Sequence, residues 1–249
     1  MKLRISRQTW LSLLSLLVTV AVWMWLARVY PSYIVPSPAK VWAKWWQLSR
    51  DGRIAVHLWA TLSPTLVGFV LATGLAFGLG YLAAQFKWLR ELAWPLTVVM
   101  QTVPIVAMLP LLVIWFGTGA STHTLIIVLV AFFPMYVTAL QAFGRRSRAL
   151  EGWMRTLAAG RVARFWYLEL PLALPELFGA LKVGFSFALI GEVVAELMMG
   201  QQGLGFLINF GRGVLDTALV FAALLTLIGL GLVMQLAFRL LEKYTLNLR

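Results

Sequence analysis

Long apolar runs, separated by short polar segments, are the feature that most restricts how this chain can fold. Of its 249 residues, 61% are hydrophobic and only 12% are charged, a composition well outside that of ordinary soluble domains. Several runs reach or approach the roughly 20 residues that a helix needs to cross a bilayer. Because backbone groups in the hydrocarbon must be satisfied within the chain, we predict an all-α integral membrane protein.

Six transmembrane helices are predicted, and together they form one transmembrane domain over residues 1–249. They cover residues 9–27, 58–84, 92–116, 125–142, 176–199 and 217–238. A cleavable signal peptide is the competing interpretation of the first run, but that run has nearly the length of a span and lacks an obvious small-residue cleavage site. In the second helix, Gly74 and Gly78 lie four residues apart and predict a bare face for close packing.

The positive charges predict how these helices are oriented. With both termini in the cytoplasm, 14 of the 21 Lys and Arg residues fall on the inner side and 6 on the outer side. Short loops rich in these residues are retained in the cytoplasm, so we expect this orientation. The formal net charge of +12 then follows from topology, and no nucleic-acid partner is expected.

Residues 30–53 are predicted to lie along the outer, periplasmic surface of the membrane. Trp42, Trp45 and Trp46 accompany lysines and arginines there. Indole rings favour the headgroup region and lysine can extend its amine to water, so the pattern predicts an amphipathic helix in contact with lipid. Its cations oppose the positive-inside rule, but the other segments agree on the orientation.

A basic segment, residues 143–175, separates the fourth and fifth predicted helices. Its cations are Arg145, Arg146, Arg148, Arg155, Arg161 and Arg164. Its apolar residues Leu157, Val162, Phe165 and Leu168 recur at roughly helical spacing. Gly160 offers a turn, and Pro171 and Pro175 stop the helix. A loop that only joined two spans would need no amphipathic helices, so we interpret this segment as a docking surface for a cytoplasmic partner.

Polar residues within the third and fifth predicted helices indicate a translocation path. Proline removes a backbone hydrogen bond, which a membrane helix tolerates where neighbours or a cavity satisfy the freed carbonyl. Ionisable residues at membrane depth usually face a bundle interior or a wet cavity. The predicted path residues are Gln101, Thr102, Pro104, Lys182, Glu192 and Glu196. The pattern is equally compatible with a buried structural hydrogen-bond network or with a side chain that extends to the membrane surface.

Several kinds of chemistry find no support in the sequence. The chain has no cysteine and only two histidines, His57 and His123, which lie far apart, so no metal site is expected. It has no GxxxxGK[ST] phosphate loop for ATP, and no cofactor of its own is expected. No nucleophile–base pair indicates an enzyme. Energy for transport must therefore come from a partner or from an ion gradient.

The basic segment resembles a known motif. MRTLAAGRVARFWYLELPLALP is similar to the EAA loop of ATP-binding-cassette (ABC) importer permeases. Leu170-Pro171 takes the family's Leu-Pro place, and Phe165 and Leu168 take its aromatic and apolar places. Two positions depart, because the family glycine falls on Ala158 and its glutamate falls on Gly152.

Other stretches extend the resemblance over residues 33–249. They are YIVPSPAKVW, PIVAMLPLLVIWFG, VVAELMMGQQGLGFLI and LDTALVF. All four are similar to permeases of the nitrate, sulfonate and taurine branch, near which the thiamine-precursor permeases belong. The resemblance implies a bacterial cytoplasmic-membrane protein with the MetI-like type I importer permease fold, a non-catalytic subunit.

The resemblance also implies partners. Two ABC ATPase subunits would bind ATP and Mg, and a periplasmic or lipid-anchored binding protein would deliver the solute. A second copy of the permease, as a homodimer, is the simplest arrangement, and a paralogous partner remains open. The residues carried over to ATPase coupling are Gly152, Arg155, Thr156, Leu157, Ala158, Ala159, Gly160, Arg161, Phe165, Leu170 and Pro171. The expected cargo is a sulfonate-, taurine- or nitrate-like anion or a thiamine precursor, and the alternative function is an ion-gradient-driven transporter or channel.

Overall fold

The computed structural model describes every residue except 1–6, 103–104, 146–151, 153, 155 and 248–249. The described residues form helices and turns, without a strand among them. The helices are α1 (Arg7–Val29), α2 (Pro38–Arg50), α3 (Arg53–Gln85), α4 (Lys87–Thr102), α5 (Ile105–Phe116), α6 (Ala120–Gly144), α8 (Arg161–Arg164), the π-helix η1 (Phe165–Glu169), α9 (Leu170–Met199), α10 (Leu204–Gly213) and α11 (Thr217–Asn247).

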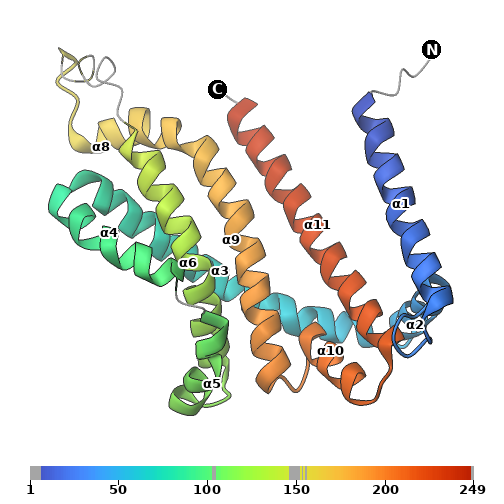
Figure 1. Cartoon of the computed structure of the whole chain (residues 1–249). Coiled ribbons are helices and arrows are strands. Elements are labelled where there is room, and N and C mark those ends of the chain that lie inside the picture. Colours follow the sequence, from blue (N-terminus) through green and yellow to red (C-terminus); the bar gives the residue numbers. More distant parts are fainter. Residues whose placement is uncertain (1–6, 103–104, 146–151, 153, 155, 248–249) are drawn as a thin grey trace.

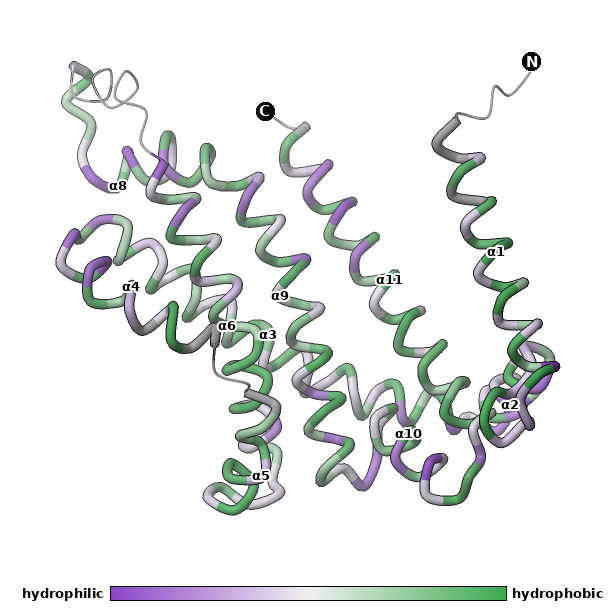
Figure 2. The backbone as a smooth tube through the Cα atoms, in the orientation of Figure 1, coloured by the Kyte–Doolittle hydropathy of each residue, from purple (hydrophilic) through white to green (hydrophobic). Residues whose placement is uncertain are grey.

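Four helical runs are long and apolar enough to cross a membrane. They are α3, α6, the continuous run 161–199 formed by α8, η1 and α9, and most of α11. Shorter apolar stretches lie at Leu14–Val29 in α1 and Ala107–Phe116 in α5. Figure 2 shows apolar residues along the middle of α1, α9 and α11. The all-α membrane fold is thus confirmed, whereas the count of six spans stays a prediction.

The third predicted helix, 92–116, corresponds to two helices in the structure. α4 ends at Thr102 and α5 begins at Ile105, and the two point in different directions in Figure 1. Pro104, which lies outside the described residues, has no backbone N–H to donate to a continuing helix. A hydropathy pattern does not register such a break, because both halves are apolar.

The helices are arranged so that the two ends of the molecule carry different elements. α6, α9 and α11 run side by side, and α3 crosses behind them (Figure 1). The beginning of α1, the end of α11 and α8 lie at one end, which we call the α8 end. α2, α5 and α10 lie at the opposite end, the α10 end.

Small residues bring α3 close to α6. Ala72 and Ala76 are fully buried, and a Cβ added at Gly68 would lie 2.5 Å from Ile127 Cγ2, or at Gly80 2.8 Å from Ala139 Cβ. These four positions on α3 are spaced by four residues and therefore share one face. The predicted face at positions 74 and 78 is a different one, and no other described part of the chain lies within 4 Å of a Cβ built there.

Candidate functional site

The basic segment turns at Leu157 and Ala158. The N–H of Ala159 donates to the carbonyl of Met154 at 3.0 Å, and Ala158 has a positive φ of 49°. A hydrogen bond across six residues, with the fifth residue in the left-handed region, is the Schellman cap that ends many helices. Glycine is favoured at that fifth position because it lacks a Cβ. This explains physically why the resembling motif has glycine where this chain has Ala158.

The second half of the basic segment continues directly into a membrane helix. α8, η1 and α9 form one run over residues 161–199. Within it, the N–H of Leu170 donates to the carbonyl of Phe165, a π-type bond over five residues. Pro171 follows and cannot donate to the carbonyl four residues earlier, so the wider turn lies where regular α-helical bonding is already interrupted. A displacement of α8 therefore acts on α9 through continuous backbone.

The apolar residues of the basic segment divide between two directions. Leu157 is 72% exposed and Val162 73% exposed, whereas Leu168 is buried. Phe165 packs inward, with its ring 5.0 Å from that of Tyr81 on α3. The roughly helical spacing of these four residues therefore does not place them on one face. One pair faces the surroundings and the other pair anchors the segment to the helices.

The other coupling positions are placed as follows. Gly152 and Thr156 are helical and exposed, Ala159 and Gly160 connect the turn to α8, and Arg161 begins α8. Leu170 and Pro171 begin α9, and Arg155 lies outside the described residues. Their role in coupling stays a prediction.

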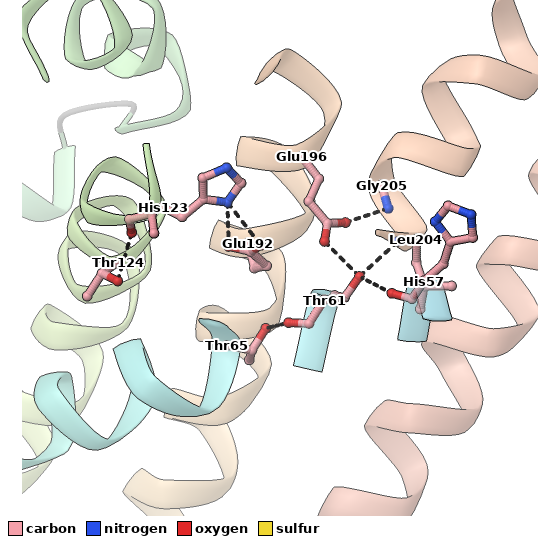
Figure 3. A network of polar contacts seen from close by, with 10 residues as sticks. His57, Thr61, Thr65, His123, Thr124, Glu192, Glu196, Leu204 and Gly205 are labelled. Atoms are coloured by element: carbon pink, nitrogen blue, oxygen red, sulfur yellow. Dashed lines mark hydrogen bonds and ion pairs between the residues drawn. The ribbon is translucent and has the colours of Figure 1, made fainter. Parts of the chain in front are cut away.

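At the α10 end, side chains from α3 and α9 hold the first N–H groups of α10 and the residue before it. Gly203 N–H donates to His57 Nδ1 at 3.1 Å, Leu204 N–H to Thr61 Oγ1 at 2.8 Å, and Gly205 N–H to Glu196 Oε2 at 2.7 Å. The Thr61 hydroxyl in turn donates to Glu196 Oε1 at 2.8 Å (Figure 3). These N–H groups have no acceptor within their own helix, so the network satisfies donors that would otherwise be buried without partners.

Glycine is required where the chain passes Glu196. A Cβ at Gly203 would lie 1.9 Å from Glu196 Oε1, and one at Gly205 2.6 Å from the carbonyl of Val193. Gly203 also has a φ of 111°, which L side chains rarely adopt. The glycines of GQQGLG therefore let the backbone approach a buried carboxylate.

Glu192, one helical turn before Glu196, pairs with a histidine. His123 Nδ1 on α6 lies 3.0 Å from both carboxylate oxygens, and Glu192 is 1% exposed. A cavity of about 380 Å³ adjoins the pair. It is lined by Ala60, Pro64, Thr118, Ala120, His123, Glu192, Glu196, Met199, Gly200, Gln201 and Gln202.

The structure does not bring all the predicted path residues together. Lys182 lies ten residues before Glu192 along α9 and pairs with Glu242 on α11. It therefore contributes no unpaired positive charge near the two glutamates. Gln101 and Thr102 are the last two residues of α4, and Pro104 lies outside the described residues. Among the predicted path residues whose side chains the structure describes, Glu192 and Glu196 adjoin the cavity and Lys182 does not.

Sequence reasoning missed several partners of these residues. The sequence pattern did not single out Thr61, because threonine is common in apolar helices. It did not indicate the acceptor role of His57 either, because a single histidine predicts no particular partner. Glu242 lies after the last predicted span, 217–238, among the cations Arg239, Lys243 and Arg249, where charged residues are unremarkable. Gln85, which contacts Glu169 of the basic segment at 2.9 Å, was not distinguishable from any residue at a helix end.

Comparison with known proteins then decides the family. Residues 76–246 match the family of binding-protein-dependent transport system inner membrane components. The chain belongs to this family. It is therefore an ABC transporter permease of the branch that includes sulfonate, taurine and thiamine-precursor systems, and a multi-pass protein of a bacterial inner membrane.

Curated relatives of the permease cover nearly its whole length. The riboflavin transport system permease protein RibX of Chloroflexus aurantiacus is 38% identical over 86% of this chain and 80% of its own. The taurine transport system permease protein TauC of Escherichia coli is 29% identical over 96% of this chain and 90% of its own. The formylaminopyrimidine transport permease protein ThiX of Halalkalibacterium halodurans is 29% identical over 94% of this chain and 93% of its own.

Proposed function

We propose that the permease forms the membrane path of an ATP-driven importer. In this assembly two copies enclose the path, two ABC ATPase subunits bind ATP and Mg at the α8 end, and a binding protein delivers solute at the α10 end. The observation that carries the proposal is the basic segment, which has an ordered turn, exposes apolar side chains and continues through η1 into α9. A partner that moves this segment would move a membrane helix.

The orientation follows from the same assembly. The α8 end would face the cytoplasm, together with both termini, and the α10 end the periplasm. The arginines and lysines of the basic segment and of the end of α11 support this orientation, because cytoplasmic segments retain such residues. α2, with its tryptophans, would then lie at the outer headgroup region.

A transporter driven by an ion gradient is less well supported. Such a mechanism needs a buried carboxylate that can exchange its ion or proton during the cycle. Both oxygens of Glu196 already accept hydrogen bonds, from Thr61 and from the backbone of Gly205. Glu196 is therefore committed to holding α10, and an ion-gradient mechanism gives no role to the exposed apolar residues of the basic segment.

The polar cavity favours an uncharged or basic heterocycle, such as a thiamine precursor, over a sulfonate or nitrate. Its lining, all of it within the described residues, contains two carboxylates, one imidazole and two side-chain amides but neither lysine nor arginine. Anions would be repelled there by an ionised carboxylate. RibX and ThiX carry names for nitrogen heterocycles, which agrees with this choice.

Co-purification tests the importer assignment. A tagged permease, solubilised gently from its native membrane, should carry a stoichiometric ATPase with a phosphate loop, and the complex should hydrolyse ATP. Replacing Ala158 by Trp should reduce the amount of bound ATPase without reducing membrane insertion of the permease. A permease that inserts and transports normally with Trp at this position would contradict the docking role.

Competition for uptake tests the cargo class. Cells or vesicles that depend on the permease are given a labelled aminopyrimidine or flavin, with and without an excess of taurine. Inhibition of uptake by unlabelled heterocycle but not by taurine is expected. Inhibition by taurine but not by unlabelled heterocycle would instead indicate that the cargo is an anion.

A further inference from the structure

Glu169 lies at the junction between the basic segment and α9, and it accepts a hydrogen bond from one element and forms an ion pair with another. Gln85 Nε2, at the end of α3, donates to one carboxylate oxygen at 2.9 Å. Arg164 Nε, at the end of α8, lies 2.9 Å from the other oxygen. Hydrogen bonds to a charged group are the stronger ones in proteins. The carboxylate therefore joins α8, η1 and α3 at one point.

An aromatic cluster reinforces this junction. The ring of Phe165 lies 5.0 Å from that of Tyr81 on α3 and 6.5 Å from that of Phe143 on α6, and Tyr81 and Phe143 are 5.2 Å apart. Rings at these separations attract one another beyond their simple burial. Phe165 thus fills the space between two membrane helices on the side of η1 that faces inward.

A cavity beside the junction leaves space for movement. It has a volume of about 390 Å³, and Gln85, Arg161, Arg164 and Glu169 are among its lining residues. Closely packed interiors resist deformation, whereas a segment beside a cavity can shift without displacing its neighbours. The lining comes from α3, α8, η1 and the residue after α3, so the cavity leaves room for α8 to shift while Glu169 keeps its contacts.

α3 connects this junction with the opposite end of the molecule. Its residue Thr61 holds α10 and lies 24 positions before Gln85 along one continuous helix, about 36 Å at the rise of an α-helix. The continuous run 161–199 is tied to α3 at two places, by Glu169 of η1 to Gln85 and by Glu196 of α9 to Thr61. A displacement of η1 would thus reach α10 along two helices rather than one.

We infer that Gln85, Glu169 and Arg164 form a clamp that transmits movement of the basic segment to α3 and so to the α10 end. These are positioning residues, which contact neither ATP nor cargo. The inference rests on the proposed function, because the ATPase supplies the movement. Without Gln85, the ATPase would still bind and hydrolyse ATP, but less of each cycle would reach the outer side.

The test uses the complete importer in lipid and follows a fluorophore at the α10 end. Because the chain has no cysteine, Val214→Cys provides one attachment site, at a position 55% exposed. The readout is the fluorescence change on addition of ATP, Mg and vanadate, alongside the rate of ATP hydrolysis. Neither readout requires the identity of the cargo.

Gln85→Leu should lower the fluorescence change while ATP hydrolysis stays close to that of the parent. A hydrogen bond to a charged group influences an equilibrium by roughly tenfold, so a decrease of up to about tenfold is expected. Gln141→Leu is the matched control, since Gln141 is an exposed glutamine on the last turn of α6 at the same end. It should leave both readouts unchanged.

The exchange of the two residues, Gln85→Glu with Glu169→Gln, keeps the hydrogen bond between α3 and η1 but removes the ion pair with Arg164, so it should restore part of the signal. A full fluorescence change in Gln85→Leu, with normal ATP hydrolysis, would overturn the clamp. If Gln85→Leu does not assemble, the exchanged pair decides: an assembled complex without the signal contradicts the inference. Failure of the parent to bind an ATPase would instead contradict the proposed function.

Discussion

The Thr61 hydroxyl of α3 donates to Glu196 of α9 at 2.8 Å and accepts the N–H of Leu204 at 2.8 Å. One hydroxyl therefore joins three helices in a region where Thr61 and Glu196 are 0% and 2% exposed. The same glutamate that seemed suited to a translocation path is used as an acceptor for α10. This structural task accounts for its position in the interior, and its role in the translocation path stays a prediction.

Thr61→Val should destabilise the permease markedly. The change keeps the shape of the side chain but leaves the Leu204 N–H and one oxygen of Glu196 without their partner, at about 1–3 kcal/mol for each buried group. Thr65→Val is the matched control, because the Thr65 hydroxyl donates only to the carbonyl of Thr61. Thermal unfolding in nanodiscs should show a clearly lower midpoint for the first variant and a small change for the second. Equal midpoints would mean that the network is unimportant.

Gly203→Ala should separate the end of α9 from α10. The added Cβ would lie 1.9 Å from Glu196 Oε1, and the residue would have a φ of 111°. Backbone strain and the loss of hydrogen bonds would therefore both weaken the contact between α9 and α10. Gly213→Ala is the control, since a Cβ there meets nothing within 4 Å. Hydrogen exchange should report faster opening of α10 in the first variant only. Unchanged protection of Leu204 and Gly205 would contradict the prediction.

Ala158→Gly should strengthen the turn of the basic segment. Alanine in the left-handed region costs about 1 kcal/mol, and the greater freedom of glycine in the unfolded chain offsets part of the gain, which leaves roughly 0.5 kcal/mol. The affinity for the partner ATPase should then rise by about twofold, whereas Ala158→Val should lower it because a β-branched residue tolerates positive φ poorly.

Ala159→Gly is the control for this series, because Ala159 lies outside the positive-φ position. It should bring no gain in ATPase affinity. An affinity order in which Val exceeds Ala and Gly at position 158 would show that the turn is rearranged in the complex.

The helices were predictable and their contacts were not. Long apolar runs placed α3, α6, α9 and α11, because the bilayer requires a helix wherever such a run crosses it. Hydropathy could not separate α4 from α5, and it could not choose between the glycine faces of α3, since spacing by four residues occurs on both. Which face of α3 meets α6 depends on the position of Ile127 and Ala139, residues more than 45 positions away in sequence.

For the candidate site, the sequence indicated which residues matter but not their partners. The cost of a buried carboxylate indicated that Glu192 and Glu196 mattered, but not what they bind. His123 and Thr61 come from other helices, and their pairing with these glutamates follows only from the assembled fold. Lys182 illustrates the opposite case, where Glu242 of α11 neutralises a residue that was predicted to line the path.

The Asp216 side chain supplies a prediction about pH at the α10 end. It pairs with Lys44 of α2 at 2.7 Å and accepts the N–H of Leu219 in the first turn of α11 at 3.0 Å. Partial burial opposes ionisation, but these two contacts together hold the pKa of the Asp216 carboxyl below its ordinary value of 3.8. A lowered pKa means stability that is present above the unfolded pKa and is lost as pH falls through the folded one.

Asp216→Asn should remove the ion pair but keep an acceptor for Leu219, and so lower stability by about 0.5 kcal/mol at neutral pH. Asp216→Ala should cost about 1 kcal/mol more, because it also removes the cap of α11. The difference between wild type and Asp216→Asn should begin to shrink as the pH falls below the ordinary pKa of 3.8 and should vanish only below the folded pKa, which is lower still. Glu91→Gln, which removes a far more exposed ion pair to Lys87, is the control and should have little effect at any pH. Melting curves in nanodiscs between pH 3 and 7 would measure these differences, and a penalty for Asp216→Asn that persists undiminished at the lowest pH would show that the ion pair is not its cause.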